Sequence, residues 1–304
     1  MNSQSDAVPE HFDSQRSAPA VMSETRPFYW SVRRELWENR SIYVAPLAAA
    51  GVYLFGFLIS LIRLPQKMRA LSTLDPAHQH AAVTMPYEFA AGLIMATTLI
   101  VAVFYCLDAL HGERRDRSIL FWKSLPVSDM TTVLSKAMIP VVVVQLVAFA
   151  VTFATQWIML MLSSAVLLGG GLNVPTLWTQ VSLFQMSLML FGHLLIMHGL
   201  WYAPVYAWLL LVSAWARRAA FLWAVLPWLT IFAVEKVAFN TSHFAAMLGQ
   251  HFAGGGQAVA SEGMSPVIGV QFSSLSSPGF WIGLAIAAIF LAGAVRVRRY
   301  QGPI

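Results

Sequence analysis

Six long apolar stretches, separated by polar or charged segments, dominate the pattern of this chain. A helix rises about 1.5 Å per residue, so about 20 apolar residues cross the hydrocarbon layer of a bilayer. Each stretch is long enough for that. The predicted spans are about 43–62, 89–107, 137–168, 187–214, 219–238 and 278–295. We therefore expect an all-α integral membrane protein in which residues 42–304 form a six-helix transmembrane domain.

Lysine and arginine residues are distributed unevenly between the segments that connect these spans. The segments before the first span, between spans two and three, between spans four and five, and after the sixth hold 15 of the 19. The other three connections hold 4. Basic residues stay on the cytoplasmic side of a membrane, so this alternation places both termini in the cytoplasm. We expect a multi-pass protein, and its expected location is the bacterial inner membrane.

The composition excludes an ordinary soluble domain. Charged residues make up 11% of the chain, against about 25% in soluble domains, and the mean hydropathy is +0.64. The net charge of +5 does not indicate nucleic-acid binding, because the basic residues lie beside apolar segments that contact membrane lipid. The single cysteine, Cys106, excludes an intrachain disulfide and any multi-cysteine metal site, and we expect it to be a packing residue.

Two segments precede the first span. Residues 1–25 are rich in Ser, Pro and Ala and are predicted to be a disordered cytoplasmic tail. Residues 26–41 place Tyr29, Val32 and Leu36 on one helical face, with charged side chains more toward the other. This pattern predicts an amphipathic helix in the membrane interface, with its aromatic rings at headgroup depth.

The connection between spans two and three, residues 108–129, combines a dense group of charges with an apolar and aromatic patch. Such a patch on a cytoplasmic connection indicates a surface for a partner. An alternative is that these side chains lie in the membrane surface or pack on the bundle. Ser128, beside Asp129, is positioned to cap the helix that leads into the third span. The patch consists of Ile119, Leu120, Phe121, Trp122 and Leu125.

The segment Gly112–Ser128, GERRDRSILFWKSLPVS, resembles ABC-2-type transporter permeases, in which a charged stretch and a Leu-Pro-Val-Ser-like turn follow the second helix. The amphipathic entry helix, the six spans and the long outer segment before the last span, about 239–277, are also similar. The resemblance implies the membrane subunit of an ATP-driven exporter. It also implies a second permease copy or a paralogue as partner, and a separate ATPase subunit that binds ATP and Mg.

In that family the segment after the second helix is a coupling helix that sits in a cleft of the ATPase. The resemblance implies that Phe121 and Trp122 are apolar anchors in that cleft, and that Pro126 ends the short helix. The nearby charges would fix the docking orientation. The expected ATPase-coupling residues are Glu113, Arg114, Arg115, Asp116, Ser118, Phe121, Trp122, Leu125 and Pro126.

The sequence offers no nucleotide-binding loop and no enzyme active site. No lysine follows a glycine, so the Gly-x-x-x-x-Gly-Lys-Ser/Thr motif that holds phosphates is absent. We expect no catalytic residue and no cofactor in this chain. A membrane-embedded hydrolase is disfavoured because the spans carry almost no acids. A scaffold or channel that docks a soluble partner without transport stays open as an alternative. His193 and His198 lie on different faces of the fourth span, so no metal site is expected.

A few polar residues in the spans are candidates for a transport pathway. Gln145, Thr152 and Gln156 share one helical face, at i, i+7 and i+11. This stripe either lines a pathway or holds helices together by hydrogen bonds. Glu235, near the outer end of the fifth span, either contacts the substrate or anchors the helix at the interface.

Overall fold

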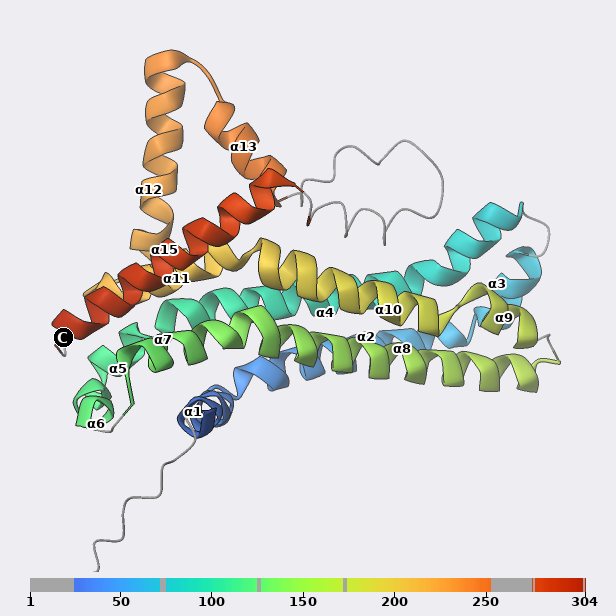
Figure 1. Ribbon diagram of the computed structural model, residues 1–304. Coiled ribbons are helices and arrows are strands. Elements are labelled where there is room, and N and C mark those ends of the chain that lie inside the picture. The colour runs from blue at the N-terminus through green and yellow to red at the C-terminus, as the bar shows by residue number, and fades with distance from the viewer. Residues whose placement is uncertain are drawn as a thin grey trace, which may run out of the picture.

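The computed structural model of the chain is helical throughout the elements that it describes (Figure 1). The described residues are 25–71, 75–124, 127–171, 174–252, 275, 277–302 and 304. Three short π-helical segments are labelled η. The elements are α1 (Thr25–Glu38), α2 (Ser41–Leu61), α3 (Leu64–Leu71), α4 (Pro76–Asp108), α5 (His111–Arg115), α6 (Ser118–Ser124), α7 (Asp129–Met138), η1 (Ile139–Val143), α8 (Val144–Gly169), α9 (Val174–Gln180), α10 (Leu183–His193), η2 (Leu194–Trp201), α11 (Ala203–Trp215), α12 (Ala220–Val234), η3 (Glu235–Phe239), α13 (His243–Phe252) and α15 (Pro278–Tyr300).

Six helical stretches among the described residues are long and apolar enough to cross a membrane. This confirms the predicted number of spanning helices, and it makes the chain a multi-pass membrane protein. α2 begins and ends close to the predicted limits of the first span, whereas several other limits differ for local reasons. The stretches are Ser41–Leu61, His78–Arg115, Asp129–Gly169, Leu177–Trp201, Ala220–Phe239 and Pro278–Tyr300.

The third span belongs to a long stretch made of α7, η1 and α8. The Ser128 hydroxyl accepts a hydrogen bond from the Thr131 amide at 3.0 Å, which confirms Ser128 as the predicted N-cap. The helix therefore starts at Asp129, ahead of the apolar run itself. Pro140 lacks an amide hydrogen, and the backbone is π-helical around it in η1.

The fourth span is divided, although one helix over 187–214 is predicted. α10 continues into the π-helical η2 at Leu194, and the helix breaks at Tyr202 before α11 begins. Pro204 stands in the first turn of α11, where its missing amide hydrogen is tolerated but cannot continue the hydrogen bonds of η2. α10 and α11 still follow one another along the bundle (Figure 1).

Apolar side chains fill the bundle in two main clusters. One includes Cys106 of α4 and Tyr206 of α11, and Cys106 is fully buried, as expected of a packing residue. The other includes Phe57 of α2 and Met159 of α8. α11 and α15 form the most extensive contact between two helices. Together these contacts hold α2, α4, α8, α11 and α15 in one bundle.

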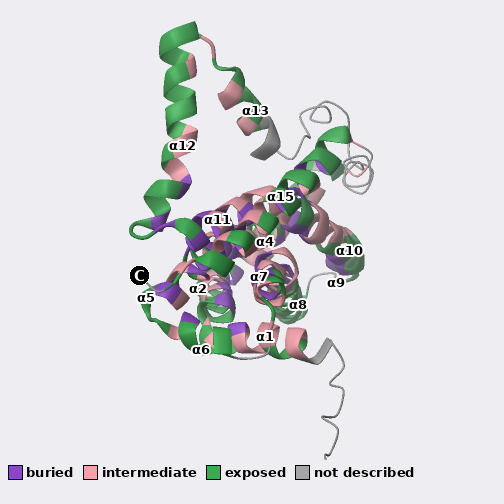
Figure 2. Cartoon of the chain, turned by 60° about the vertical axis from the view of Figure 1, so that its left-hand side comes forward, coloured by how far each residue is buried: buried purple, intermediate pink, exposed green. Residues whose placement is uncertain are grey.

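α12 departs from this packing. Figures 1 and 2 show α12 leaving the bundle steeply, with mostly exposed side chains. α13 (His243–Phe252) runs from the far end of α12 back toward the bundle. The Glu235 carboxylate holds the turn between them, because it accepts hydrogen bonds from the Thr241 hydroxyl at 2.9 Å and from the His243 and Phe244 amides at 2.6 and 2.8 Å. Glu235, a candidate pathway residue, thus caps the start of α13.

The π-helical segments η1 and η2 pack against each other at Gly199. A Cβ atom at this position would lie 2.5 Å from the carbonyl oxygen of Val141. Atoms at that distance overlap, and the neighbour is backbone, which cannot rotate away as a side chain can. Glycine at position 199 is therefore required for this helix crossing.

We expect Gly199→Ala to lower the free energy of unfolding by about 1–3 kcal/mol, because an added methyl group must push η1 and η2 apart. Thermal unfolding of the purified protein in detergent measures this. Gly92→Ala is the matched control, since a Cβ there meets nothing within 4 Å. Equal melting temperatures for the two variants would contradict the close crossing.

Candidate functional site

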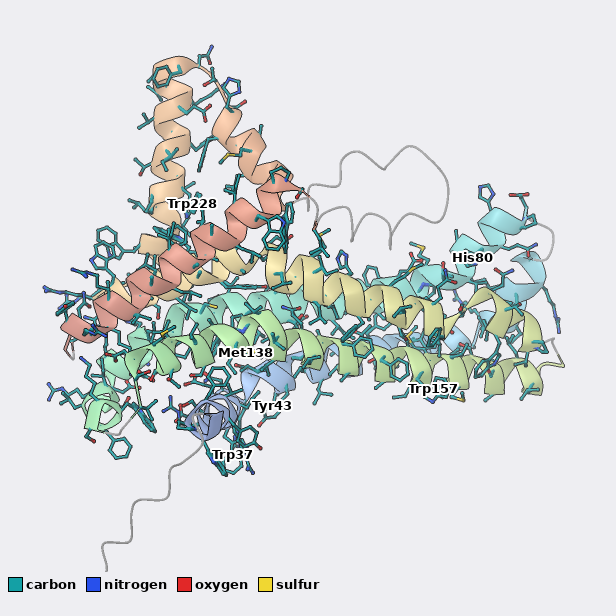
Figure 3. All side chains as sticks on the ribbon, viewed as in Figure 1. Trp37, Tyr43, His80, Met138, Trp157 and Trp228 are labelled. Atoms are coloured by element: carbon teal, nitrogen blue, oxygen red, sulfur yellow. The ribbon has the colours of Figure 1, made fainter. Side chains whose placement is uncertain are left out.

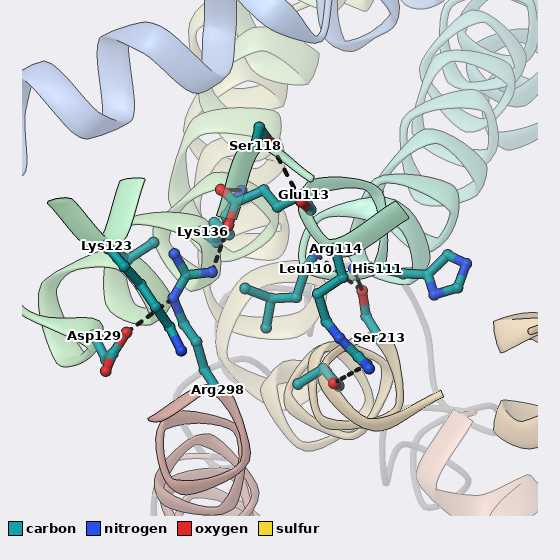
Figure 4. Close-up of polar contacts among 12 residues, drawn as sticks. Leu110, His111, Glu113, Arg114, Ser118, Lys123, Asp129, Lys136, Ser213 and Arg298 are labelled. Carbon is teal, nitrogen blue, oxygen red and sulfur yellow. Dashed lines mark hydrogen bonds and ion pairs between the residues drawn. The ribbon is translucent and has the colours of Figure 1, made fainter. Parts of the chain in front are cut away.

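Six charged side chains meet at the end of the bundle where α1, α5 and α6 lie, which we call the charged end (Figure 1). Four helices that are distant in sequence contribute them. Figure 4 shows part of the arrangement, with Lys136, Glu113 and Arg298 close together. We call the six residues the charged cluster: Arg34 and Glu35 of α1, Glu113 of α5, Asp129 and Lys136 of α7, and Arg298 of α15.

Lys136 is the centre of the charged cluster. Its Nζ lies 2.8 Å from Glu35 Oε1 and 3.1 Å from Glu113 Oε1, and the Lys136 and Glu35 side chains are 3% and 1% exposed. Arg34 Nη2 approaches the same two carboxylates, at 2.7 Å and 3.3 Å. One ammonium and one guanidinium group therefore join α1, α5 and α7.

Arg298 ties the last helix to the same group. Its Nη1 forms a short ion pair with Glu113 Oε2, and its Nε lies 3.2 Å from Asp129 Oδ1. The six residues are three cations and three carboxylates, and the exposed Glu38 adds a further carboxylate 3.5 Å from Arg34 Nε. A buried charge is tolerated only when it is paired and hydrogen-bonded, and here every member has a partner of opposite sign.

Glu35 is ionised in this setting despite its burial. Burial alone would raise its pKa, but Lys136 and Arg34 outweigh that effect and hold the pKa of Glu35 below its ordinary range. The Tyr105 hydroxyl donates a further hydrogen bond to Glu35 Oε2 at 2.9 Å. Glu35 therefore connects α1 to α4 as well as to α7.

A second set of contacts fastens α5 to the end of α11. Arg114 is buried, and its Nη1 donates to the carbonyl oxygens of Ala214 and Ala216 at 2.7 and 3.2 Å. The Leu110 and His111 amides donate to the Ser213 hydroxyl at 3.0 and 2.9 Å. These carbonyl groups lie at the C-terminal end of α11, where the last carbonyl oxygens of a helix have no hydrogen-bond donor within the helix. The start of α5 is therefore fixed on two sides.

The tip of the α5–α6 segment (His111–Ser124) is exposed. Leu120 and Phe121 of α6 are 59% and 60% exposed, while Ile119 is buried and anchors the same helix. Trp122 lies under the guanidinium of Arg34, whose Cζ is 3.7 Å from the ring centroid. Leu120 and Phe121 thus form an apolar tip on a base that the bundle holds.

The structure separates the expected ATPase-coupling residues into two groups. Glu113 and Arg114 face the chain's own helices, and the Ser118 hydroxyl donates to the Glu113 carbonyl at 3.4 Å. Arg115 and Asp116 are exposed and pair with each other at 3.2 Å. Phe121 is exposed and Trp122 is partly covered. Leu125 and Pro126 lie outside the described residues.

The polar stripe on α8 lies inside the chain. Gln145, Thr152 and Gln156 are all buried. The Gln156 side-chain amide donates to the Tyr87 carbonyl at 3.2 Å, and that of Gln145 donates to the Pro140 carbonyl at 2.9 Å. These bonds hold α8 to α4 and stabilise the π-helical η1.

No group of three or more possible metal ligands occurs among the described residues. His193 and His198 come close, with ring centroids 5.1 Å apart, because η2 is wound more widely than an α-helix. The prediction that they occupy different faces assumed α-helical geometry. Two histidines alone are fewer ligands than a zinc site uses.

Replacing Lys136 by Met removes one of the two cations that Glu35 and Glu113 share, and leaves Arg34 as the only cation between these buried carboxylates. We expect Lys136→Met to cost about 3–5 kcal/mol of stability, measured by thermal unfolding in detergent. The double variant Glu35→Gln/Lys136→Met should recover part of the loss, because it removes one of the two carboxylates that had lost an ion pair with Lys136. Arg63→Met, at an exposed position, is the control. Wild-type stability of Lys136→Met would contradict the charged cluster.

The lowered pKa of Glu35 predicts the direction of the pH dependence. A carboxylate whose pKa is depressed by folding adds stability above its unfolded-state pKa, near 4.5, and loses it as the pH falls through the folded-state pKa. We therefore expect the melting temperature to fall as acidity increases below pH 4.5. In Glu35→Gln, which starts less stable, this acid-dependent fall should be smaller. An unchanged slope in that variant would show that Glu35 is not the titrating group.

Comparison with known proteins gives no relative. No protein-family model matches the chain, and neither a curated protein nor a solved structure matches it. The case for a function therefore rests on the sequence of the α5–α6 segment, on the six apolar helices and on the geometry of the charged end.

Proposed function

We propose that this chain is the membrane-spanning subunit of an ATP-driven exporter, and that its α5–α6 segment docks on a separate ATPase. The observation that carries the proposal is the exposed pair Leu120 and Phe121, held on a short helix whose base is fixed to the bundle. An apolar tip of this kind is suited to fill a pocket of a partner.

The contacts of the base explain how movement of the tip would reach the membrane. Glu113 links α5 to α7 through Lys136 and to α15 through Arg298. Arg114 links α5 to the end of α11, and Trp122 links α6 to α1 through Arg34. A push on α6 therefore acts on four helices together. A loosely attached loop would absorb the same push by bending.

The orientation follows from the same proposal. The ATPase needs ATP and Mg, which are available in the cytoplasm, so the charged end faces the cytoplasm. The distribution of basic residues predicts the same orientation. Both termini are then cytoplasmic, and the membrane is the bacterial inner membrane. A second copy of the chain or a paralogue completes the transporter. The resemblance of Gly112–Ser128 to ABC-2-type permeases supports this assembly.

A scaffold or channel that docks a soluble partner is the competing function. It would use Leu120 and Phe121 in the same way, but its partner would hydrolyse no ATP in response to docking. Identification of the partner therefore separates the two functions.

We expect Leu120→Ala/Phe121→Ala to weaken binding of the ATPase by at least about tenfold, because two exposed apolar anchors are removed. The measurement is purification of the tagged chain in mild detergent, with quantification of every stoichiometric partner and of ATP hydrolysis. The melting temperature of the variant should stay close to that of the wild type.

Phe184→Ala is the matched control, since Phe184 is 82% exposed on α10, away from the α5–α6 segment. It should leave partner binding unchanged. Recovery of no ATPase with the wild-type chain in several mild detergents would overturn the exporter proposal. Recovery of a soluble partner without ATPase activity would favour the scaffold or channel.

A further inference from the structure

The outward face of α1 carries aromatic side chains instead of the polar ones that a water-facing helix carries. Tyr29, Trp30 and Trp37 are all exposed, Trp30 by 57% and Trp37 by 68%. The inward face carries Glu35, which is buried in the charged cluster. Exposed indole rings on the outward face suit a helix whose outward face meets lipid headgroups, where tryptophan is enriched.

The orientation of α1 agrees with that location. Figure 1 shows α1 end-on beside the bundle, whereas α2, which follows it, runs along the bundle. The 21 residues of α2 span about 32 Å, close to the thickness of the hydrocarbon layer. With α2 across the membrane, α1 lies in the plane of its surface. Figure 3 shows Trp37 on the side of α1 away from the bundle.

Arg33 occupies the middle of this outward face. Its Cζ lies 5.1 Å from the Trp30 ring centroid and 4.9 Å from that of Trp37. These cation–π contacts hold the guanidinium in place. Within the described part of the chain Arg33 forms no hydrogen bond and no ion pair, so its five N–H donors remain available. Its neighbour Arg34 differs, because Glu35 and Glu113 engage it.

We propose that Arg33 binds the phosphate group of a phospholipid, and that the site prefers an anionic phospholipid to a zwitterionic one. A guanidinium group matches two phosphate oxygens with two parallel hydrogen bonds. The indoles of Trp30 and Trp37 place it at phosphate depth and cover the glycerol and upper acyl carbons of the lipid. A zwitterionic headgroup brings a cation of its own beside Arg33, which weakens the pair.

The lipid is favoured over free phosphate as the source of the phosphate group. Inorganic phosphate would satisfy the Arg33 guanidinium but would leave both exposed indoles uncovered. A lipid satisfies the charge and the apolar surface together. A protein partner on the same face is the other outcome, and it would bind independently of the lipid headgroup.

The test uses the delipidated full chain in detergent, titrated with phosphatidylglycerol or phosphatidylcholine, with bound lipid counted by native mass spectrometry. We expect phosphatidylglycerol to bind more tightly to the wild type. In Arg33→Gln the apparent affinity for phosphatidylglycerol should fall about tenfold, because the charge-assisted contact between the guanidinium and the phosphate is lost. Arg33→Lys should retain part of the preference, and Arg63→Gln should retain all of it.

Two further measurements decide between the alternatives. The melting temperature of lipid-free Arg33→Gln should match that of the wild type, which shows that the variant folds. Inorganic phosphate should not displace phosphatidylglycerol. Unchanged phosphatidylglycerol binding in Arg33→Gln, or displacement by inorganic phosphate, would overturn the proposal. Neither result depends on whether the chain binds an ATPase.

Discussion

The charged cluster exists because a charge removed from water must be neutralised by a partner held at hydrogen-bonding distance. Lys136 lies at the start of a long apolar helix, and its ammonium group is buried between Glu35 and Glu113. Arg298 then neutralises the remaining charge of Glu113. Each pairing draws in another helix, so four helices are positioned by one requirement. The placement of α1, of α5 and of the final helix depends on it.

This requirement divides the charged end into a fixed part and an accessible part. At the base of the α5–α6 segment, Glu113 and Arg114 bind other helices of the same chain. Their side chains are therefore not available to a partner protein. What remains accessible is apolar, in Leu120 and Phe121. α1 has the same division, with Glu35 directed inward and Arg33 outward. In both places the buried charge orients the helix, and the exposed side chains meet the surroundings.

The sequence predicts the number of spanning helices well, because a continuous apolar run is a local property. It also predicts the cap at Ser128, which depends on neighbours three residues apart. It could not pair Glu35 with Lys136, since 101 residues separate them and a pairing across the fold leaves no periodic trace. The break before Ala203 was missed because hydropathy does not report backbone hydrogen bonding, although Pro204 was a visible signal. The sequence also did not indicate that Glu235 caps α13, because its donors belong to a turn rather than to a span.

The positions of the charged cluster along the chain also set the order in which its ion pairs can form during synthesis. Glu35 leaves the ribosome first, Lys136 follows 101 residues later, and the partner that Glu113 finds in Arg298 is made 185 residues after it. Until the last helix is inserted, Glu113 and Asp129 lack that guanidinium. The charged end therefore closes last, and a nascent chain that stalls before α15 has Asp129 without its ion-pair partner and Glu113 with one cation fewer. The unpaired charge of Asp129 therefore distinguishes an unfinished chain from a finished one.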